Sequence, residues 1–537
     1  MDTQLTISSI LRHADRNHGD REIVSVTVDN PLHRYNFADC CRRSRQLANA
    51  LDKLGLSQGD RVATLAWNDY RHLEAYYAIG GAGYVCHTIN PRLFAEQIVF
   101  IINHAEDKWI LTDPLFVPLL EQLADKTPGV EGYIVLTDDA HMPETSLRNA
   151  VAYESFIAAE SDVYDWPELD ERSAVGLCYT SGTTGDPKGV LYSHRSSVLH
   201  AYAGIAPDVL NVSTRDCILP VVPLFHVNAW GAPYAALMVG AKLVFPGPKM
   251  GDGETLYRLL ESEQVTLALG VPTVWMALLQ YAEKEGKRLN CLQRTVIGGA
   301  AVPESMIREF RDKHGVVVHQ GWGMTEMSPL GTLNTLKAGM EKLSPDEIIA
   351  IRTKAGRGIY GVEMKIVDDD ENELPWDGQA FGALRVRGPW ICSGYFKIDA
   401  TGSYDRDGWF DTGDVATIDA EGFLAITDRT KDVIKSGGEW ISSIEIENAA
   451  IGHPAVAEAA VIGVPHPKWT ERPLLIVIRA EGQDLTRDEM LAWLEGKIAK
   501  WWLPGDVVFV DEIPHTATGK IKKIDLRKQF ADYQLPE

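Results

Sequence analysis

The chain has 537 residues, of which 45% are hydrophobic and 24% are charged, which is typical of a globular protein of several domains and excludes disordered or collagen-like chains. The 52 Lys and Arg against 75 Asp and Glu give a net charge of −23, so we expect no nucleic-acid partner. Seven scattered cysteines without a C-x-x-C pair indicate reduced thiols and a cytoplasmic protein without a disulfide framework or zinc site.

Strands and helices alternate through the first 300 residues, which predicts parallel sheets covered by helices on both faces. The predicted helices include residues 39–55 and 95–106. The predicted strands span residues 61–68, 84–90, 109–113, 132–138, 174–182, 242–247, 265–272 and 294–300.

The two ends of the chain and one uncharged stretch bear on membrane association. The first residues lack the basic and apolar regions of a signal peptide, and the last six, DYQLPE, carry no lipidation signal. Residues 217–241 contain no Asp, Glu, Lys or Arg but hold Pro220, Pro223 and Pro233, which a spanning helix tolerates poorly. We therefore expect no membrane partner and interpret this stretch as buried strand, loop and helix.

The pattern changes after about residue 360. The β-rich runs 362–370, 382–389 and 423–435 predict a barrel-like or antiparallel unit, and a compact last unit follows a hinge at Asp428–Lys431. In that unit we expect helices at 442–454 and 486–502, the second opened by a Thr486/Glu489 capping box, and strands at 457–465, 472–480 and 507–514.

The expected fold class is thus α/β. A large N-terminal domain of residues 1–428 combines parallel-sheet α/β subdomains with a β-barrel-like subdomain. A small α+β C-terminal domain of residues 429–537 follows.

The segment 179–189, YTSGTTGDPKG, follows a predicted strand. Its glycines let backbone N–H groups approach phosphate oxygens, its hydroxyls add donors, and its lysine adds charge. The glycine-to-lysine spacing differs from a Walker A loop, and Gly189 stands where Ser or Thr should bind magnesium. A plain surface loop is the alternative to a phosphate site. The predicted phosphate ligands are Thr180, Ser181, Gly182, Thr183, Thr184 and Lys188.

Four further motifs follow in order. They are GWGMTE (321–326), WFDTGD (409–414), DRTKD (428–432) and PHTATGK (514–520). Together with 179–189 they resemble the adenylate-forming superfamily of acyl-CoA synthetases, aryl-CoA ligases, firefly-type luciferases and peptide-synthetase adenylation domains. The resemblance covers essentially the whole chain. Trp322 stands where many members carry Tyr, a difference that keeps an aromatic face.

The resemblance implies ATP, Mg²⁺ and coenzyme A as ligands. Trp322 would stack on adenine, Asp414 would accept from the ribose hydroxyls, and Glu326 with Thr184 would hold Mg²⁺. Lys520 would reach the carboxylate and the α-phosphate. A core tryptophan, a turn-forming aspartate, a solvated glutamate and a lysine of a basic tail are the respective alternatives. Further implied nucleotide contacts are Gly298, Gly299, Ala300, Gly323, Thr325 and Arg429.

In this superfamily the C-terminal domain is mobile and swings between two half-reactions. Lys520 faces the site first, and the segment beginning at Arg429 faces it second. Lys435 would then contact the reactants, while Gly437 and Gly438 would let a thin thiol arm pass.

The segment 223–230, PLFHVNAW, resembles the gate of fatty-acid members. His226 would lie beside the carboxylate, Trp230 and Val227 would line the acyl channel with Gly299 and Met324, and Pro329 would close its end. A core histidine and a core tryptophan are the alternatives.

The gate segment and residues 323–329, GMTEMSP, resemble those of short- to medium-chain fatty acyl-CoA ligases and 3-methylmercaptopropionyl-CoA ligases. The leading hypothesis is therefore an ATP-dependent acid–CoA ligase whose partners are a small aliphatic acid, ATP and CoA. Alternatives are a ligase that loads a separate acyl carrier protein, a luciferase-like oxygenase and an inactive nucleotide-binding scaffold. A homodimer is a further hypothesis, because oligomers are common among related ligases.

Overall fold

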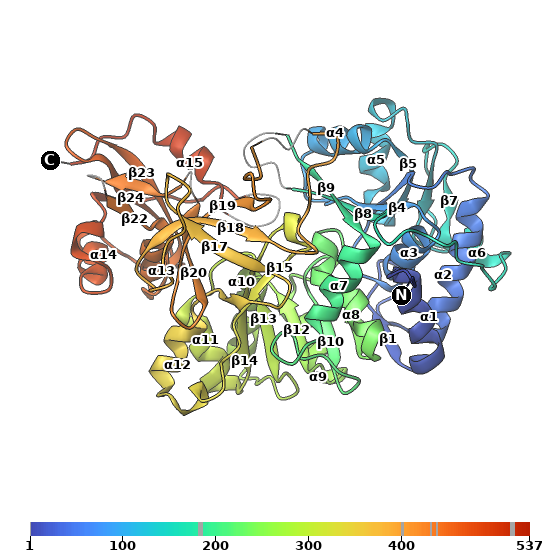
Figure 1. Ribbon diagram of the computed structural model, residues 1–537, viewed down its shortest axis with the longest axis horizontal. Helices are drawn as coiled ribbons and strands as arrows, with labels where there is room; N and C mark the ends of the chain where they lie inside the picture. The colour runs from blue at the N-terminus through green and yellow to red at the C-terminus, as the bar shows by residue number, and fades with distance from the viewer. Residues whose placement is uncertain are drawn as a thin grey trace.

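The computed structural model describes residues 2–180, 186–398, 402–429, 432–436, 439–515 and 521–536, without the side chains of residues 435, 439 and 440. Three sheets organise these residues. The seven-stranded sheet and the five-stranded sheet lie toward opposite ends of the long axis, and the largest sheet runs between them (Figure 1).

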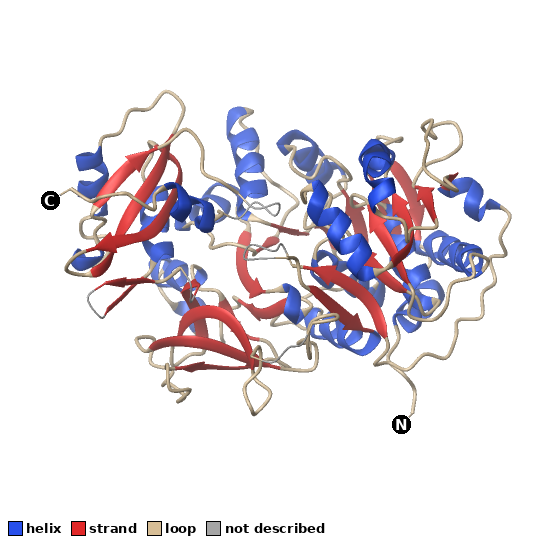
Figure 2. Ribbon diagram, turned by 90° about the horizontal axis from the view of Figure 1, so that it is seen from above, coloured by secondary structure: helices blue, strands red, loops and turns tan. Residues whose placement is uncertain are grey.

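The seven-stranded sheet has the order β7-β6-β5-β3-β4-β8-β9, and only the β8–β9 pair is antiparallel. Its strands are β3 (Arg61–Leu65), β4 (Val85–Thr88), β5 (Asp107–Thr112), β6 (Gly132–Val135), β7 (Val151–Ala152), β8 (Ala174–Tyr179) and β9 (Gly189–Ser193). The helices of this part are α2 (Phe37–Asp52), α3 (Tyr70–Gly81), α4 (Ala95–Ala105), α5 (Val117–Leu123) and α6 (Tyr153–Ala158). All four residues of β4 are buried, as expected for a parallel strand covered on both faces, and helices flank these strands in Figure 2.

The 13-stranded sheet joins a parallel half to an antiparallel half through β14. Apart from the antiparallel β1–β2 edge, the first half is parallel and contains β1 (Glu22–Ser25), β2 (His33–Asn36), β10 (Cys217–Pro220), β11 (Lys242–Phe245), β12 (Leu267–Gly270), β13 (Arg294–Ile297) and β14 (Val317–Gly323). The antiparallel half contains β15 (Leu330–Leu333), β16 (Gly356–Gly358), β17 (Glu363–Val367), β18 (Phe381–Arg387), β19 (Phe410–Ile418) and β20 (Phe423–Arg429). The remaining helices of this region are α1 (Ile7–His18), α7 (His194–Gly204), α8 (Ala232–Val239), α9 (Gly253–Ser262), α10 (Pro272–Lys284), α11 (Glu304–Glu309) and α12 (Pro345–Arg352).

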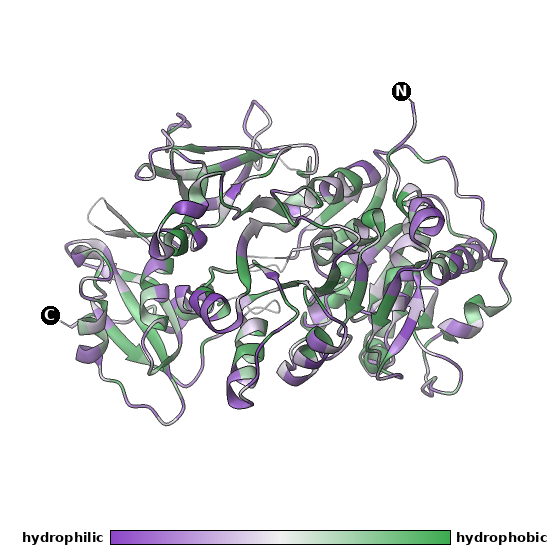
Figure 3. Cartoon of the chain, turned by 90° about the horizontal axis from the view of Figure 1, so that it is seen from below, coloured by the Kyte–Doolittle hydropathy of each residue, from purple (hydrophilic) through white to green (hydrophobic). Residues whose placement is uncertain are grey.

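The predicted α/β class, with a parallel part followed by an antiparallel part, is confirmed. Residues 217–241 form β10, a loop and α8, as the prolines indicated. No helix among the described residues is long and apolar enough to cross a bilayer. Hydrophobic residues gather in the strands of the sheets (Figure 3).

The C-terminal sheet has the order β22-β21-β24-β23, with β25 parallel to β24. Its elements are β21 (Ile434–Ser436), β22 (Glu439–Ile441), α13 (Ser443–Ile451), β23 (Val456–His466), β24 (Thr470–Arg479), α14 (Arg487–Leu494), β25 (Asp506–Phe509) and α15 (Lys523–Gln529).

One prediction for this part was wrong in detail. The predicted helix 486–502 has its Thr486/Glu489 capping box, but α14 ends at Leu494 because Glu495 takes an extended ψ of 128° and Gly496 a φ of 77°. The β-rich run 423–435 forms two strands, β20 in the large sheet and β21 in the C-terminal sheet.

Candidate active site

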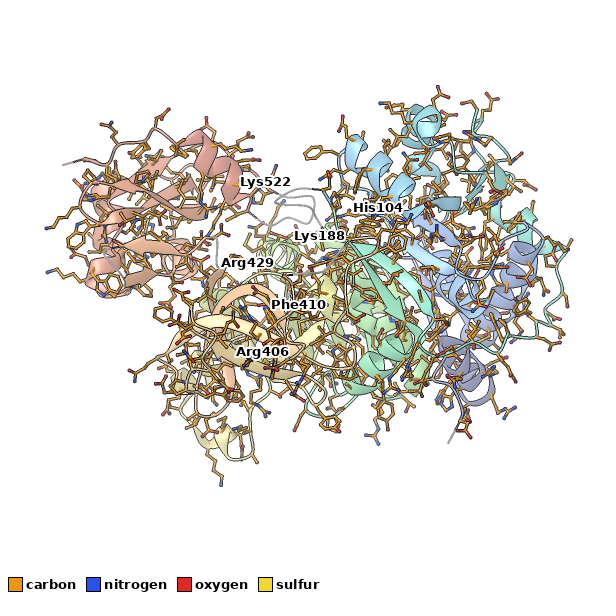
Figure 4. All side chains as sticks on the ribbon, turned by 45° about the horizontal axis from the view of Figure 1, so that its top comes forward. His104, Lys188, Arg406, Phe410, Arg429 and Lys522 are labelled. Carbon is orange, nitrogen blue, oxygen red and sulfur yellow. The ribbon has the colours of Figure 1, made fainter. Side chains whose placement is uncertain are left out.

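A cavity of about 960 Å³ opens where the carboxyl ends of the parallel strands meet the antiparallel half of the large sheet and helix α15. Its lining includes the residues that follow β10, β12 and β13, the end of β14, and Thr180 at the end of β8. Ligands of open α/β sheets bind at such carboxyl ends. Lys188, Arg429 and Lys522 reach this region from three parts of the chain (Figure 4).

The neck of the predicted phosphate loop is closed by hydrogen bonds between its two ends. The Thr180 backbone N–H donates to the Lys188 carbonyl oxygen at 2.9 Å, and the Lys188 N–H donates to Thr180 Oγ1 at 3.1 Å. Both residues line the cavity. The other predicted phosphate ligands, Ser181, Gly182, Thr183 and Thr184, lie outside the described residues. The two described ends of the predicted phosphate loop therefore lie at the cavity edge.

Asp414, the predicted ribose acceptor, lies buried just behind the lining with 3% of its surface exposed. Trp322 donates its indole N–H to Asp414 Oδ2 at 2.9 Å, and Arg429 Nε pairs with Asp414 Oδ1 at 2.8 Å. The structure thus brings these three predicted residues together. A ribose that binds Asp414 must share this carboxylate with Arg429 or displace it.

Glu326 lines the cavity with only 6% of its surface exposed. Tyr395 donates its hydroxyl to Glu326 Oε1 at 2.7 Å. Burial, then the nearby Glu326 charge, raises the pKa of Tyr395, so the phenol stays protonated and remains a donor. Tyr192 donates to the neighbouring Thr325 carbonyl oxygen at 2.7 Å, which fixes the backbone of the motif.

The gate segment contains a left-handed turn. Residues 227–230 have φ between 42° and 57°, a region that costs L-residues about 1–2 kcal/mol each. Two buried side chains hold the start of this turn: Tyr76 donates its hydroxyl to the Leu224 carbonyl oxygen, and Asn68 Oδ1 accepts from the Leu224 N–H at 2.7 Å. Surrounding structure thus imposes a backbone that the local sequence disfavours.

Trp230 packs against the glycine that follows β13. A Cβ on Gly298 would lie 3.1 Å from Trp230 Cη2 and 3.0 Å from the Gly321 carbonyl oxygen, so the absent side chain makes room for the indole. Besides Thr180, Lys188, Trp322, Glu326 and Arg429, the predicted acyl and nucleotide residues that line the cavity are His226, Val227, Trp230, Gly298, Gly299, Ala300, Gly323, Met324, Thr325 and Pro329.

The C-terminal part reaches the cavity through the start of α15, and Lys522, Lys523 and Arg527 line it. Arg527 pairs with Asp432 at 2.5 Å, and Lys523 pairs with Glu447 at 2.8 Å. Lys520, Gly437 and Gly438 lie outside the described residues. Lys435 lies in β21, but its side chain is not described.

Two lining residues have no signal in the sequence motifs. Tyr395 contacts Glu326 from 69 positions away, and only its Ser-Gly-Tyr-Phe context hints at a turn. Arg92 lies over the Trp67 ring at 5.7 Å and has no carboxylate partner among the described residues. Its Asn-Pro-Arg string after β4 could have been noticed as a strand end next to the phosphate loop.

The sequence profile of AMP-binding enzymes matches residues 11–396, and the profile of the AMP-binding enzyme C-terminal domain matches residues 445–520. The chain belongs to the AMP-binding enzyme family. The resemblance read from the motifs is therefore confirmed, and this AMP-binding enzyme is an adenylate-forming acyl-CoA ligase that uses ATP and CoA.

This AMP-binding enzyme is 52% identical over 535 residues to the medium-chain-fatty-acid–CoA ligase of Ectopseudomonas oleovorans, covering 100% of this chain and 98% of that protein. It is also 52% identical over 532 residues to the 3-methylmercaptopropionyl-CoA ligase of Ruegeria lacuscaerulensis, with coverages of 99% and 98%. The crystal structure of ATP-bound MatB from Rhodopseudomonas palustris matches its fold with a TM-score of 0.82 and 26% identity, over 98% and 99% of the two chains.

Proposed function

We propose that this acyl-CoA ligase activates short- to medium-chain aliphatic acids, 3-methylmercaptopropionate among them. Identity of 52% over essentially full length to two enzymes named for such acids carries the proposal. The cavity lining agrees. Between residues 221 and 300, a stretch described throughout, His226 is the one ionisable side chain that lines it. That wall offers no partner to an ammonium group or a second carboxylate.

The chemistry follows from the leaving group. A carboxylate oxygen attacks the α-phosphorus of ATP and the bond to pyrophosphate breaks, which converts a poor acyl donor into an acyl-adenylate. The thiol of CoA then attacks the acyl carbon, loses its proton, and releases AMP. The protein positions the reactants and stabilises charge on phosphorus. We assign the phosphates to the 180–188 loop, the adenosine to Trp322 and Asp414, the carboxylate to His226, and the charge developing in the first step to Lys520.

Mg²⁺ belongs to this proposal, with Glu326 and Thr184 as its protein ligands. Glu326 fits the role because it is nearly buried at the cavity wall and, among the described residues, forms no ion pair with a Lys or Arg. Magnesium prefers one or two carboxylates together with substrate phosphates. Bound there, it would neutralise charge on the phosphate oxygens.

We further propose that residues 429–537 form a domain that moves relative to residues 1–428. Lys520 would serve adenylation, and Arg429, Lys435, Gly437 and Gly438 would serve thioester formation. The separate C-terminal sheet supports this division. A cytoplasmic location and a homodimer stay predictions, and light scattering tests the second.

Substrate class is tested by kcat/KM for AMP formation with acids from acetate to dodecanoate, 3-methylmercaptopropionate, benzoate and amino acids. We expect a maximum at short to medium aliphatic acids. 3-Methylmercaptopropionate should lie within about tenfold of the alkanoate of equal length, because a thioether is nearly isosteric with that alkanoate and even a missing methylene costs only about 1–3 kcal/mol. Each reaction is run with CoA and without it. A preference for benzoate or an amino acid would overturn the proposal.

A further inference from the structure

Residues 395–398, which we call the strap, extend from the antiparallel half of the large sheet to the seven-stranded sheet. The Phe396 backbone N–H donates to the Gly189 carbonyl oxygen at 2.8 Å, and the Phe396 ring meets the His104 ring edge-on at 5.6 Å. Lys397 Nζ donates to the His104 carbonyl oxygen at 3.0 Å. His104, which is labelled beside Lys188 in Figure 4, is not among the residues that line the cavity. The strap is therefore anchored outside the cavity.

The first residue of the strap, Tyr395, engages two functional side chains at once. Its hydroxyl donates to Glu326 Oε1 at 2.7 Å, and the Lys188 ammonium lies over its ring at 4.8 Å from the centroid. All three residues line the cavity. They come from the loop before β9, the turn after β14 and the strap, so no local motif joins them.

Opposite charges in one cavity tend to pair, and a pair of Lys188 with Glu326 would withdraw both from a ligand. Tyr395 offers each a partner without a net charge. A neutral hydroxyl hydrogen-bonds the carboxylate and leaves its charge intact, while the negative face of the ring attracts the ammonium. Among the described residues, Lys188 and Glu326 form no ion pair with each other or with any other residue.

We propose that Tyr395 is a positioning residue that holds Lys188 and Glu326 apart, so that Lys188 can serve the ATP phosphates and Glu326 the magnesium ion. This inference rests on the roles proposed above for those two residues. The anchored strap supplies the rigidity, because its contacts with Gly189 and His104 do not depend on a bound ligand.

Two substitutions separate the two contacts. Tyr395→Phe keeps the ring beneath Lys188 and removes the hydroxyl, whereas Tyr395→Leu removes both. Tyr404→Phe is the matched control, because Tyr404 is another partly buried tyrosine whose hydroxyl donates to the Cys392 carbonyl oxygen instead of the Glu326 carboxylate.

Binding of ATP is measured by titration calorimetry over a range of Mg²⁺ concentrations and in EDTA, without an acid substrate. Conversion of supplied acyl-adenylate by CoA is measured separately. Mg²⁺ is expected to tighten ATP binding, and the Mg²⁺ concentration that gives half of this effect should be about tenfold higher in Tyr395→Phe. That is the usual effect of losing a hydrogen bond to a charged group. ATP binding by this variant in EDTA should stay unchanged. Tyr395→Leu should also weaken binding in EDTA, and all three variants should convert supplied adenylate at the parent rate.

Two results would show that Tyr395 does not position Lys188 and Glu326. In one, Tyr395→Phe binds ATP with the Mg²⁺ dependence of the parent. In the other, it slows adenylate conversion as strongly as it weakens ATP binding in the presence of Mg²⁺. Glu326→Gln distinguishes this outcome from failure of the underlying role. If Glu326→Gln also leaves the Mg²⁺ dependence intact, Glu326 is no metal ligand, and both statements fall together. If only Glu326→Gln changes it, the metal role stands and the Tyr395 proposal alone is overturned.

Discussion

Lys523 is the clearest place to test the energetics of the C-terminal part. Its ammonium pairs with Glu447 at 2.8 Å and donates to Ser443 Oγ, which itself donates to Asp428 Oδ2 at 2.5 Å. The side chains of Lys523 and Glu447 are each 11% exposed, and Asp428 is 1% exposed. One cation thus stands between two buried carboxylates, that of Asp428 at the start of the predicted hinge and that of Glu447 beyond it.

Lys523→Met keeps an unbranched side chain, one atom shorter, and the helical propensity, but leaves the carboxylate of Glu447 buried without its cation. Breaking a buried pair in this way costs about 3–5 kcal/mol. For a unit of about 100 residues, each kcal/mol shifts the unfolding midpoint by about 4–8 °C. The transition of the C-terminal part should therefore fall by about 12 °C or more.

Calorimetry resolves this transition, and hydrogen exchange of residues 456–479 assigns it to the C-terminal sheet. Lys522→Met is the matched control, because Lys522 pairs with Asp525 where the side chains are 30% and 36% exposed, and such pairs contribute about 0–1 kcal/mol. Adding Glu447→Gln to Lys523→Met should restore part of the loss by removing the unpaired charge. Equal midpoints for the two single lysine variants would refute this reasoning.

Three further predictions concern the cavity and its surroundings. Burial lowers the pKa of His200 from 6.5 to about 4, and its Nε2 accepts from the Leu330 N–H at 3.1 Å. Between these two pH values the unfolded chain binds a proton at His200 that the folded chain does not. The stability present above pH 6.5 is therefore lost as the pH falls toward 4, by about 3 kcal/mol. His200→Gln keeps the hydrogen-bond acceptor and should reduce the slope of the unfolding free energy against pH over this window by the contribution of one proton. An unchanged slope would contradict the burial argument. Gly298→Ala should push Trp230 into the cavity and move the chain-length optimum of kcat/KM toward shorter acids, and a shift toward longer acids would contradict this packing. Asp414→Asn should raise the KM for ATP about tenfold through a weaker acceptor, and an increase confined to the KM for CoA would contradict the ribose assignment.

Much of the fold follows from short-range pattern. The predicted strand 265–272 becomes β12 at Leu267–Gly270, whose four residues are apolar and buried, as a parallel strand covered on both faces requires. The capping box at Thr486 also formed as predicted, since its two hydrogen bonds are local. The end of that helix was missed at Glu495, where Gly496 with its positive φ was the available signal.

The candidate site was likewise predictable from the sequence only in part. Thr180, Lys188 and Glu326 line one cavity, as the motifs implied, since each stands in a recognisable string. Tyr395 could not be found, because its partner is 69 residues away and no periodicity connects them. The left-handed turn at 227–230 was equally hidden, since a β-branched residue such as Val227 disfavours that backbone. Both features are imposed by tertiary contacts.

The central claim is a two-step reaction through an acyl-adenylate, and isotope exchange tests it most directly. The enzyme is incubated with ATP, Mg²⁺, labelled pyrophosphate and octanoate or 3-methylmercaptopropionate in the absence of CoA. The account predicts acid-dependent transfer of label into ATP without CoA, and stoichiometric AMP and acyl-CoA once CoA is added. Exchange that requires CoA, or release of ADP and phosphate in place of AMP and pyrophosphate, would contradict it.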